Sequence, residues 1–130
     1  MADKLNVSLV SPERELFSGQ VDQVDLPGTE GNMGILPKHA PLMAALSTRA
    51  ITLYDDGREE KFFVQGGFAD VTPAGLTILA ERAVPLVDLT RDDLSAEIEK
   101  AKADLATLSD EGALAARQNL DGLEAIFNLV

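Results

Sequence analysis

The side chain best suited to acid–base chemistry in this 130-residue sequence is its single histidine, His39, in the run Lys38-His39-Ala40-Pro41. Imidazole titrates near neutral pH and can act as a general base or a metal ligand. No serine or acidic residue stands beside it, and because the chain has no cysteine, a zinc site would take every other ligand from Asp or Glu. We therefore interpret His39 as a loop histidine that hydrogen-bonds the backbone, and we predict no catalytic and no metal-binding residues.

A second candidate for chemistry is the glycine-rich run GTEGNMG, with Gly28, Gly31 and Gly34. Glycines can cradle a phosphate, but such loops lie between a strand and a helix or carry the pattern GxxxxGK[ST], and neither that context nor that pattern is present here. Together with Pro37 and Pro41, these glycines restrict the backbone strongly. The pattern predicts a loop of specific shape over residues 27–42, with neither a helix nor a regular strand.

The residues that this loop presents mix polar tips with large apolar groups, which suits a contact surface better than a catalytic pocket. They are Glu30, Asn32, Met33, Ile35 and Leu36. The alternative is a long connector in which Ile35 and Leu36 only plug an edge of the core.

The composition excludes several functional classes. The net charge is −11, from 11 basic and 22 acidic residues, so phosphate backbones and anionic lipid surfaces would repel the chain. The absence of cysteine excludes disulfides and fits a reducing compartment. The apolar runs are shorter than the roughly 20 residues that span a bilayer. Basic, apolar or mixed protein surfaces are the expected partners.

The elements that must position these residues change type along the chain. Short alternating runs separated by turns extend from Leu5 to about Ala80, which favours a β-sandwich or flattened barrel. Asp55-Asp56-Gly57 predicts a tight hairpin turn, around which the neighbouring carboxylates are expected to be solvated. Gly66-Gly67 predicts a bulge or bend.

After Pro85 the apolar residues recur at three- and four-residue steps, which predicts two amphipathic helices with a turn at residues 109–112. Thr90 is the expected N-cap of the first helix. We thus expect a β domain over residues 1–87 and a helical hairpin over residues 88–130. Two helices packed only on each other leave part of each apolar stripe exposed to solvent, so the hairpin is predicted to dock on the sandwich or on another protein. Its stripes are Leu94, Ile98, Ala101, Leu105 and Leu108, and Ala113, Ala116, Leu120, Leu123 and Phe127.

Several motifs, in this order and spacing, resemble the epsilon chain of bacterial F-type ATP synthase, the counterpart of mitochondrial delta. They are SPER at 11–14, SG at 18–19, GNMGILPKHAP at 31–41, GGF at 66–68 and ILAE at 78–81, and the resemblance covers nearly the whole chain. It implies a sandwich of about ten strands followed by two antiparallel helices. It also implies a non-catalytic subunit of the central rotor, without a cofactor, that binds the gamma chain and stands on the ring of c subunits.

The resemblance also assigns roles to residues. Glu30, Gly31, Asn32 and Met33 are expected to face the c ring, while Gly28, Gly34, Pro37, His39 and Pro41 set the shape of the loop. The family often carries an acid where Asn32 stands, and Glu30 could substitute for it. The implied location is peripheral, on the cytoplasmic face of a bacterial inner membrane, with membrane association indirect through the complex.

Regulation is the alternative function, because in some relatives the helices inhibit ATP hydrolysis through the beta chain or bind ATP through D-x-x-R-A. Here Asp88 and Arg91 match that motif, but Asp92 replaces the alanine and would repel phosphate, so the site is expected to be vestigial. Residues 91–130 hold four basic and nine acidic residues, a balance of −5, and attract an acidic segment of beta poorly. We therefore expect weak or absent inhibition. An unrelated carbohydrate-binding or hydrolytic sandwich is disfavoured because the chain has no Trp and only Tyr54.

Overall fold

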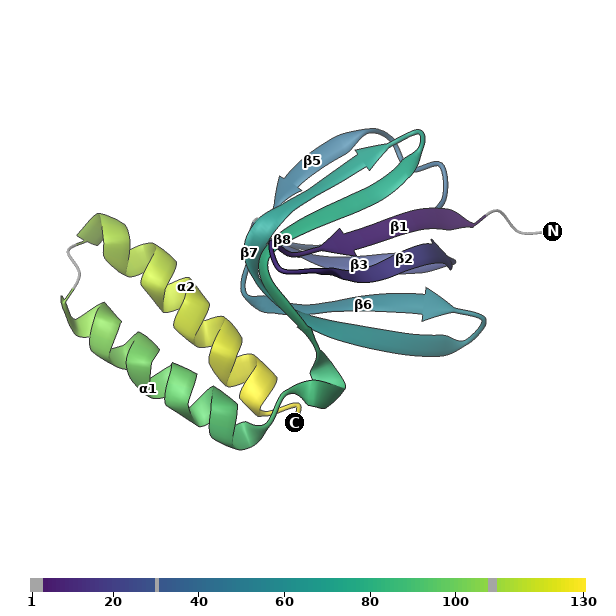
Figure 1. Cartoon of the computed structure of the whole chain (residues 1–130). Coiled ribbons are helices and arrows are strands. Elements are labelled where there is room, and N and C mark those ends of the chain that lie inside the picture. Colours follow the sequence, from purple (N-terminus) through teal and green to yellow (C-terminus); the bar gives the residue numbers. More distant parts are fainter. Residues whose placement is uncertain (1–3, 30, 108–109) are drawn as a thin grey trace.

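The computed structural model describes residues 4–29, 31–107 and 110–130, which form a β-sandwich followed by two packed helices (Figure 1). This confirms the predicted fold class. The strands are β1 Leu5–Val10, β2 Glu15–Val21, β3 Gln23–Gly28, β4 Gly31–Ile35, β5 Leu42–Ala45, β6 Arg49–Asp55, β7 Arg58–Thr72 and β8 Gly75–Pro85. A 3₁₀ turn, η1 Leu86–Asp88, leads into α1 Arg91–Thr107 and α2 Asp110–Phe127.

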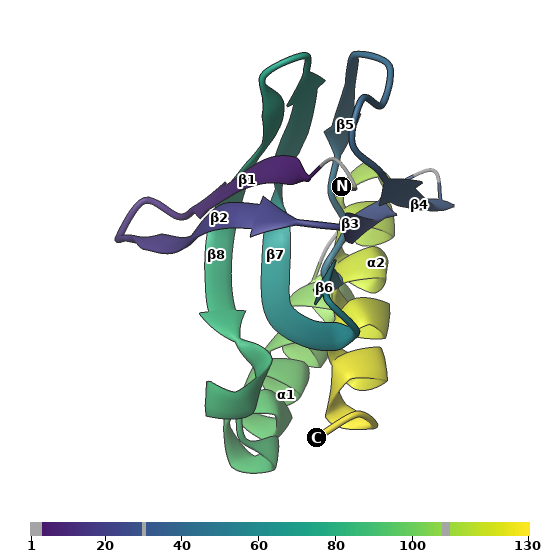
Figure 2. The ribbon, with the colours of Figure 1, turned by 90° about the vertical axis from the view of Figure 1, so that its right-hand side faces the viewer.

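The strands form a single folded sheet in the order β2-β1-β8-β7-β6-β3-β4, with β5 paired to β7. Most neighbouring strands are antiparallel, whereas β1 lies parallel to β8. The long strands β7 and β8 curve through the molecule and take part in both layers of the sandwich (Figures 1 and 2). The tight turn predicted at Asp56-Gly57 joins β6 to β7, and both residues have positive φ, as a type I′ turn requires.

The bend predicted at Gly66-Gly67 lets β7 and β8 change layers together. The ladder pairs Gln65 with Arg82 and Gly67 with Ala80, so one residue on each strand, Gly66 and Glu81, stays outside it. The inward-facing positions of β7 therefore switch from Phe62 and Val64 before the bend to Ala69 and Val71 after it. If each bent strand is counted twice, the eight strands become ten, the number that the family resemblance implies.

The prediction that residues 27–42 contain no regular strand is wrong. Gly31–Ile35 form β4, which pairs antiparallel with β3 from Gly28↔Gly31 to Val24↔Ile35. The two prolines at 37 and 41 follow this strand, and glycine weakens a strand without forbidding one. Met33 and Ile35 pack against the sandwich core, and this burial offsets the cost of ordering the glycines.

The sandwich interior is a continuous apolar cluster. Its fully buried side chains include Leu9, Leu26, Ile35, Ile51 and Phe62, and the partly buried ring of Phe17 meets Phe62 edge to face with a centroid separation of 6.4 Å. Because protein interiors are packed as densely as organic crystals, such a core resists shear.

The helical hairpin docks on the sandwich, one of the two possibilities that the sequence left open. A second apolar cluster joins Leu94 of α1 with Leu123 and Ile126 of α2. It also includes Phe63 of β7, whose side chain faces the helices rather than the sandwich interior. Thr90 caps α1 as expected, since its Oγ1 accepts a hydrogen bond of 3.1 Å from the N–H of Asp93. Arg82 of β8 pairs with Glu97 of α1. Leu108 and Ser109, where the predicted 109–112 turn begins, lie outside the described residues. The rest of that prediction is wrong, because residues 110–112 already belong to α2.

Candidate functional site

Gly28 at the end of β3, Thr29 just after it, and Gly31 and Asn32 at the start of β4 form a surface that we call the tip; Glu30 between them lies outside the described residues. Thr29, Gly31 and Asn32 are exposed, whereas Gly28 is buried. Gly31 has a φ of 138°, and a Cβ built there would meet no described atom within 4 Å, so a side chain at this position would make no contact. The N–H of Thr29 donates a 3.0 Å hydrogen bond to the carbonyl of Ala45, which ties the tip to the end of β5.

Met33 and Gly34 support the tip from within β4. Met33 is half-buried and packs against the core, and its Cε would lie 2.9 Å from a Cβ added at Gly28. A Cβ at Gly34 would lie 3.1 Å from the side-chain amide of Gln23. Two of the predicted contact residues, Gly31 and Asn32, are thus presented to solvent, while Met33 mainly fixes the strand beneath them.

His39 lies at the other end of β4 from the tip. Its Nδ1 is 2.7 Å from the carbonyl oxygen of Ala40, and its N–H donates to the carbonyl of Leu36 at 3.1 Å. With Pro37, it lines a hollow of about 220 Å³ beside Pro73 in the β7–β8 turn. These contacts fit the interpretation of a loop histidine that hydrogen-bonds the backbone, and they lie in the connection between β4 and β5.

The outer face of the sheet carries an apolar row that sequence reasoning missed. The strand registers place Ala45, Phe68, Leu79 and Val10 side by side across β5, β7, β8 and β1. Phe68 and Leu79 are each 56% exposed. The sequence feature that could have revealed this row is a Phe and a Leu at paired positions of neighbouring strands. The sequence does not show that these two side chains face outward, because the inward-facing positions switch at the bend.

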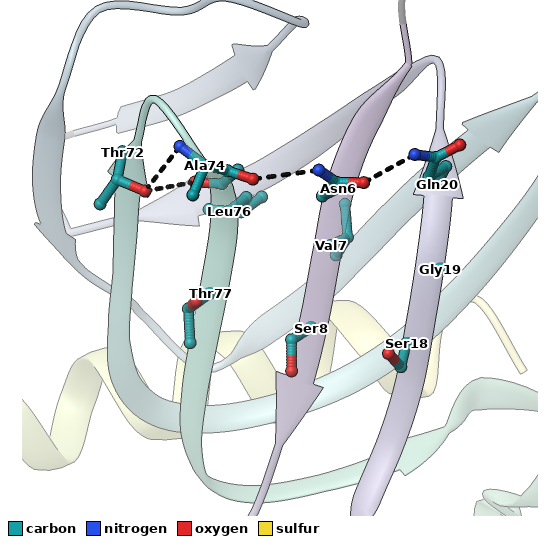
Figure 3. A pocket seen from close by; sticks show the side chains of 11 residues that line it. Asn6, Val7, Ser8, Ser18, Gly19, Gln20, Thr72, Ala74, Leu76 and Thr77 are labelled. Carbon is teal, nitrogen blue, oxygen red and sulfur yellow. Dashed lines mark hydrogen bonds between the residues drawn. The ribbon is translucent and has the colours of Figure 1, made fainter.

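A polar hollow of about 300 Å³ continues this outer face over β1, β2 and β8 (Figure 3). Asn6 stands at its centre, donating a 3.1 Å hydrogen bond to the carbonyl of Ala74 and accepting one of 2.8 Å from Gln20. Ser8, paired with Ser18 and Thr77 on its neighbours, adds small hydroxyl groups. None of the described residues that line the hollow titrates near neutral pH, so the hollow offers hydrogen bonds and close approach rather than acid–base catalysis.

Arg91, one of the two matches to a nucleotide motif, is engaged inside the helical hairpin. Its Nε donates a 2.6 Å hydrogen bond to the carbonyl of Val130, and its guanidinium lies 5.0 Å from the ring centroid of Phe127. Asp88 is exposed in η1, and among the described residues no hydrogen bond or ion pair joins it to Arg91. The structure therefore gives Arg91 the role of holding the end of α2 against the start of α1.

Three carboxylates, Asp22, Asp55 and Asp56, approach within 4.8 Å of one another, close enough to suggest a cation site. The ammonium of Lys4 already occupies their centre, at 2.7 Å from Asp22, 2.5 Å from Asp55 and 3.5 Å from Asp56. The predicted solvated carboxylates of the β6–β7 turn are therefore partly paired, and this cluster fastens the start of β1 to the turn.

Replacing Lys4 by Met should lower the melting temperature at pH 7. The pKa of the Asp22 carboxyl lies below its ordinary value of 3.8. The main cause is the hydrogen bond from Lys4, and a second cause is the hydrogen bond from the backbone N–H of Asp56. A lowered carboxyl pKa stabilises the fold above that ordinary value, and the benefit disappears as the pH falls through the folded-state pKa. The difference between wild type and variant should therefore shrink as the pH falls below the ordinary carboxyl value of 3.8. Calorimetry at pH 7 and in acid below that value measures it, with Lys102→Met as the control, and a difference that persists in acid would contradict the ion-pair explanation.

Within the described residues, neither helix has the length and apolar composition of a membrane span.

Residues 4–86 match the family model for the ATP synthase delta/epsilon chain β-sandwich domain. The chain is 52% identical to the ATP synthase epsilon chain of Maricaulis maris over 85% of this chain and 84% of that one. It is 50% identical to that of Parvibaculum lavamentivorans over 100% of both chains.

Two solved structures share the fold. A chain of the Euglena gracilis mitochondrial ATP synthase, in a structure of OSCP, F1 and c-ring, superposes with a TM-score of 0.78 at 22% identity, covering 97% of this chain and 81% of that one. A chain of the Tetrahymena thermophila mitochondrial ATP synthase central stalk and c-ring superposes with a TM-score of 0.70 at 15% identity, covering 98% and 96%. From the family model and the full-length bacterial relatives, the chain belongs to the epsilon-chain family of ATP synthase, the non-catalytic subunits of that complex.

Proposed function

We propose that the chain is a central-stalk subunit of an F-type ATP synthase that couples rotation of the c ring to the catalytic sector through the gamma chain. The observation that carries this proposal is the close similarity to bacterial epsilon chains along the sandwich and the helices together. A densely packed sandwich that resists shear suits a part that transmits torque. Its place in the cell is then peripheral, on the cytoplasmic side of a bacterial inner membrane, attached through the complex.

The outer sheet face is the surface that we assign to the gamma chain. The apolar row of Phe68, Leu79, Ala45 and Val10 is flanked by the small polar groups of Ser8, Ser18 and Thr77. An apolar centre with a polar rim is the usual anatomy of a protein interface. Two large apolar side chains, both more than half exposed, favour a permanent partner at this face.

The tip is the surface that we assign to the c ring. Thr29, Gly31 and Asn32 are polar or small and exposed, and the space beside Gly31 is open. Thr29 lies in the β3–β4 turn and Gly31 and Asn32 lie on β4, whereas the apolar row lies on β5, β7, β8 and β1, so we assign the two partners to different parts of the sheet.

Asn32→Lys and Thr29→Lys should weaken attachment to the c ring by roughly tenfold each while sparing the gamma chain. Each change places a flexible cation on an exposed contact without touching the core. Retention of purified c ring and of purified gamma by the immobilised protein measures the two effects separately, with Lys102→Glu on the exposed face of α1 as the control. Equal loss of both partners would count against separate surfaces, and unchanged ring binding would count against the tip.

Removing residues 88–130 from the assembled enzyme should change ATP hydrolysis less than about twofold, because the acidic hairpin attracts an acidic partner poorly. The β domain of residues 1–87 is proposed to keep its fold without the hairpin, since its core cluster draws only on strand residues and their connections. Truncation uncovers Phe63, so the shortened chain should also carry Phe63→Ser to prevent aggregation. Strong activation of hydrolysis on truncation would instead support the regulatory alternative.

A further inference from the structure

Three parts of the molecule meet at the connector between β5 and β6, residues Leu46, Ser47 and Thr48, which we call the 46–48 connector. Toward the tip, the N–H of Ser47 donates to the carbonyl of Pro27 at 2.8 Å, its hydroxyl donates to the same oxygen at 3.0 Å, and Leu46 bridges Gly28. Toward the bend, the N–H of Leu46 donates to the carbonyl of Gly67 at 2.9 Å.

On its other side the connector is pressed against α2. Thr48, which is buried, donates from Oγ1 to the side-chain oxygen of Asn119 at 2.8 Å. Gly122 packs so closely that an added Cβ would lie 2.7 Å from the carbonyl carbon of Thr48 and overlap its oxygen. The connector therefore contacts backbone of α2 without a side chain between them.

The tip and α2 also face each other directly. An open cavity of about 480 Å³ is lined by Thr29 and Asn32 of the tip, by Ser47 of the connector and by Gln118 and Asp121 of α2. The connector that hydrogen-bonds Pro27 therefore lies between the tip and the docked helix.

We infer that docking of α2 on the 46–48 connector sets the conformation of the tip, so that the position of the helical hairpin is transmitted to the surface that faces the c ring. The consequence for the ring rests on the proposed function. The coupling itself does not, because it concerns two parts of one chain. Its physical basis is a short chain of packed backbone and hydrogen bonds running from Gly122 and Asn119 through Thr48 and Ser47 to Pro27.

Amide hydrogen exchange on the full-length chain tests this coupling. In Gly122→Val, the N–H groups of Ser47 and Thr29 should exchange at least about tenfold faster than in wild type, since both hydrogen bonds lose their support. The N–H groups of the β1–β2 ladder are the internal reference and should be unchanged. Leu123→Asp provides a second route, because a carboxylate at a position that is 1% exposed must expel α2 from its docking site.

The outcomes separate the coupling from the assignment of the tip to the ring. If α2 amides in either variant exchange rapidly while those of Thr29 and Ser47 keep their wild-type protection, the coupling is overturned. It is also overturned if both variants keep α2 protected, because the close packing at Gly122 and Leu123 would then not hold the helix. If the tip loses protection and yet binds purified c ring as wild type does, the coupling stands and the assignment of the tip to the ring fails. Val87→Asp, on an exposed residue of η1 away from the connector, is the matched control.

Discussion

Gly67→Ala should lower the free energy of unfolding by about 3 kcal/mol, which is a large share of the stability of a small domain. Gly67 has a φ of 120°, a backbone region that residues with a Cβ avoid. The added Cβ would lie 2.8 Å from Cα of Ala80 and would overlap the carbonyl oxygen of Leu79, both of which belong to the backbone of β8. The bend could accept the methyl group only by separating the two strands that join both layers. Urea denaturation followed by circular dichroism measures the change.

Gly19→Ala is the matched control for this substitution. Gly19 is exposed in β2 without a positive φ, and its added Cβ would meet the Phe17 ring at an ordinary 3.4 Å. That variant should stay within about 0.5 kcal/mol of wild type or be slightly more stable, because alanine restricts the unfolded chain. Equal stability of the Gly67 and Gly19 variants would show that the bend does not hold the sandwich together.

Leu79→Asp should weaken binding of the gamma chain by about 100-fold or more, the second large effect that we expect. Leu79 lies in the middle of the apolar row, between Phe68 on β7 and Val10 on β1. Because its side chain is 56% exposed in the free chain, the aspartate is solvated there and should leave the fold intact. Buried under a partner, the same charge loses its water without gaining a counter-ion. Titration calorimetry with purified gamma chain gives the affinity.

Leu114→Asp introduces the same charge at a similarly exposed leucine, 63% exposed, on α2. It should bind gamma with the affinity of wild type. If the two variants bind alike, the gamma chain does not cover the outer sheet face, whatever the absolute affinities are.

Much of the fold could be predicted because single local signals determined it. Asp56-Gly57 specified its turn, Thr90 specified the start of α1, and the three- and four-residue spacing of Leu94, Ile98 and Ala101 specified the buried side of that helix. Docking of the hairpin could be predicted because two helices packed only on each other leave apolar side chains exposed. Only the structure shows that the apolar surface which receives it includes Phe63, together with Ala50 and Val84 on the neighbouring strands. Phe62, the residue before Phe63, points into the sandwich instead.

The parts that escaped prediction depend on pairing between distant residues. Gly31–Ile35 contains two glycines and becomes a strand only because β3 supplies hydrogen bonds and the core receives Met33 and Ile35. The apolar row could not be assigned to the outer face, since the unpaired Gly66 and Glu81 switch the inward positions of both strands. Gly122 carried no signal of its own, because glycine inside a helix normally costs stability, and its packing against Thr48 is a purely tertiary contact.

The most direct test of the rotor-subunit account is ATP synthesis by the complete enzyme in vesicles under an imposed proton gradient. Enzyme stripped of this chain should make little ATP, added wild-type chain should restore the yield, and Leu79→Asp should restore much less at the same concentration, whereas Leu114→Asp should restore it fully. Full synthesis by the stripped enzyme would contradict the claim that this subunit couples the ring to the catalytic sector.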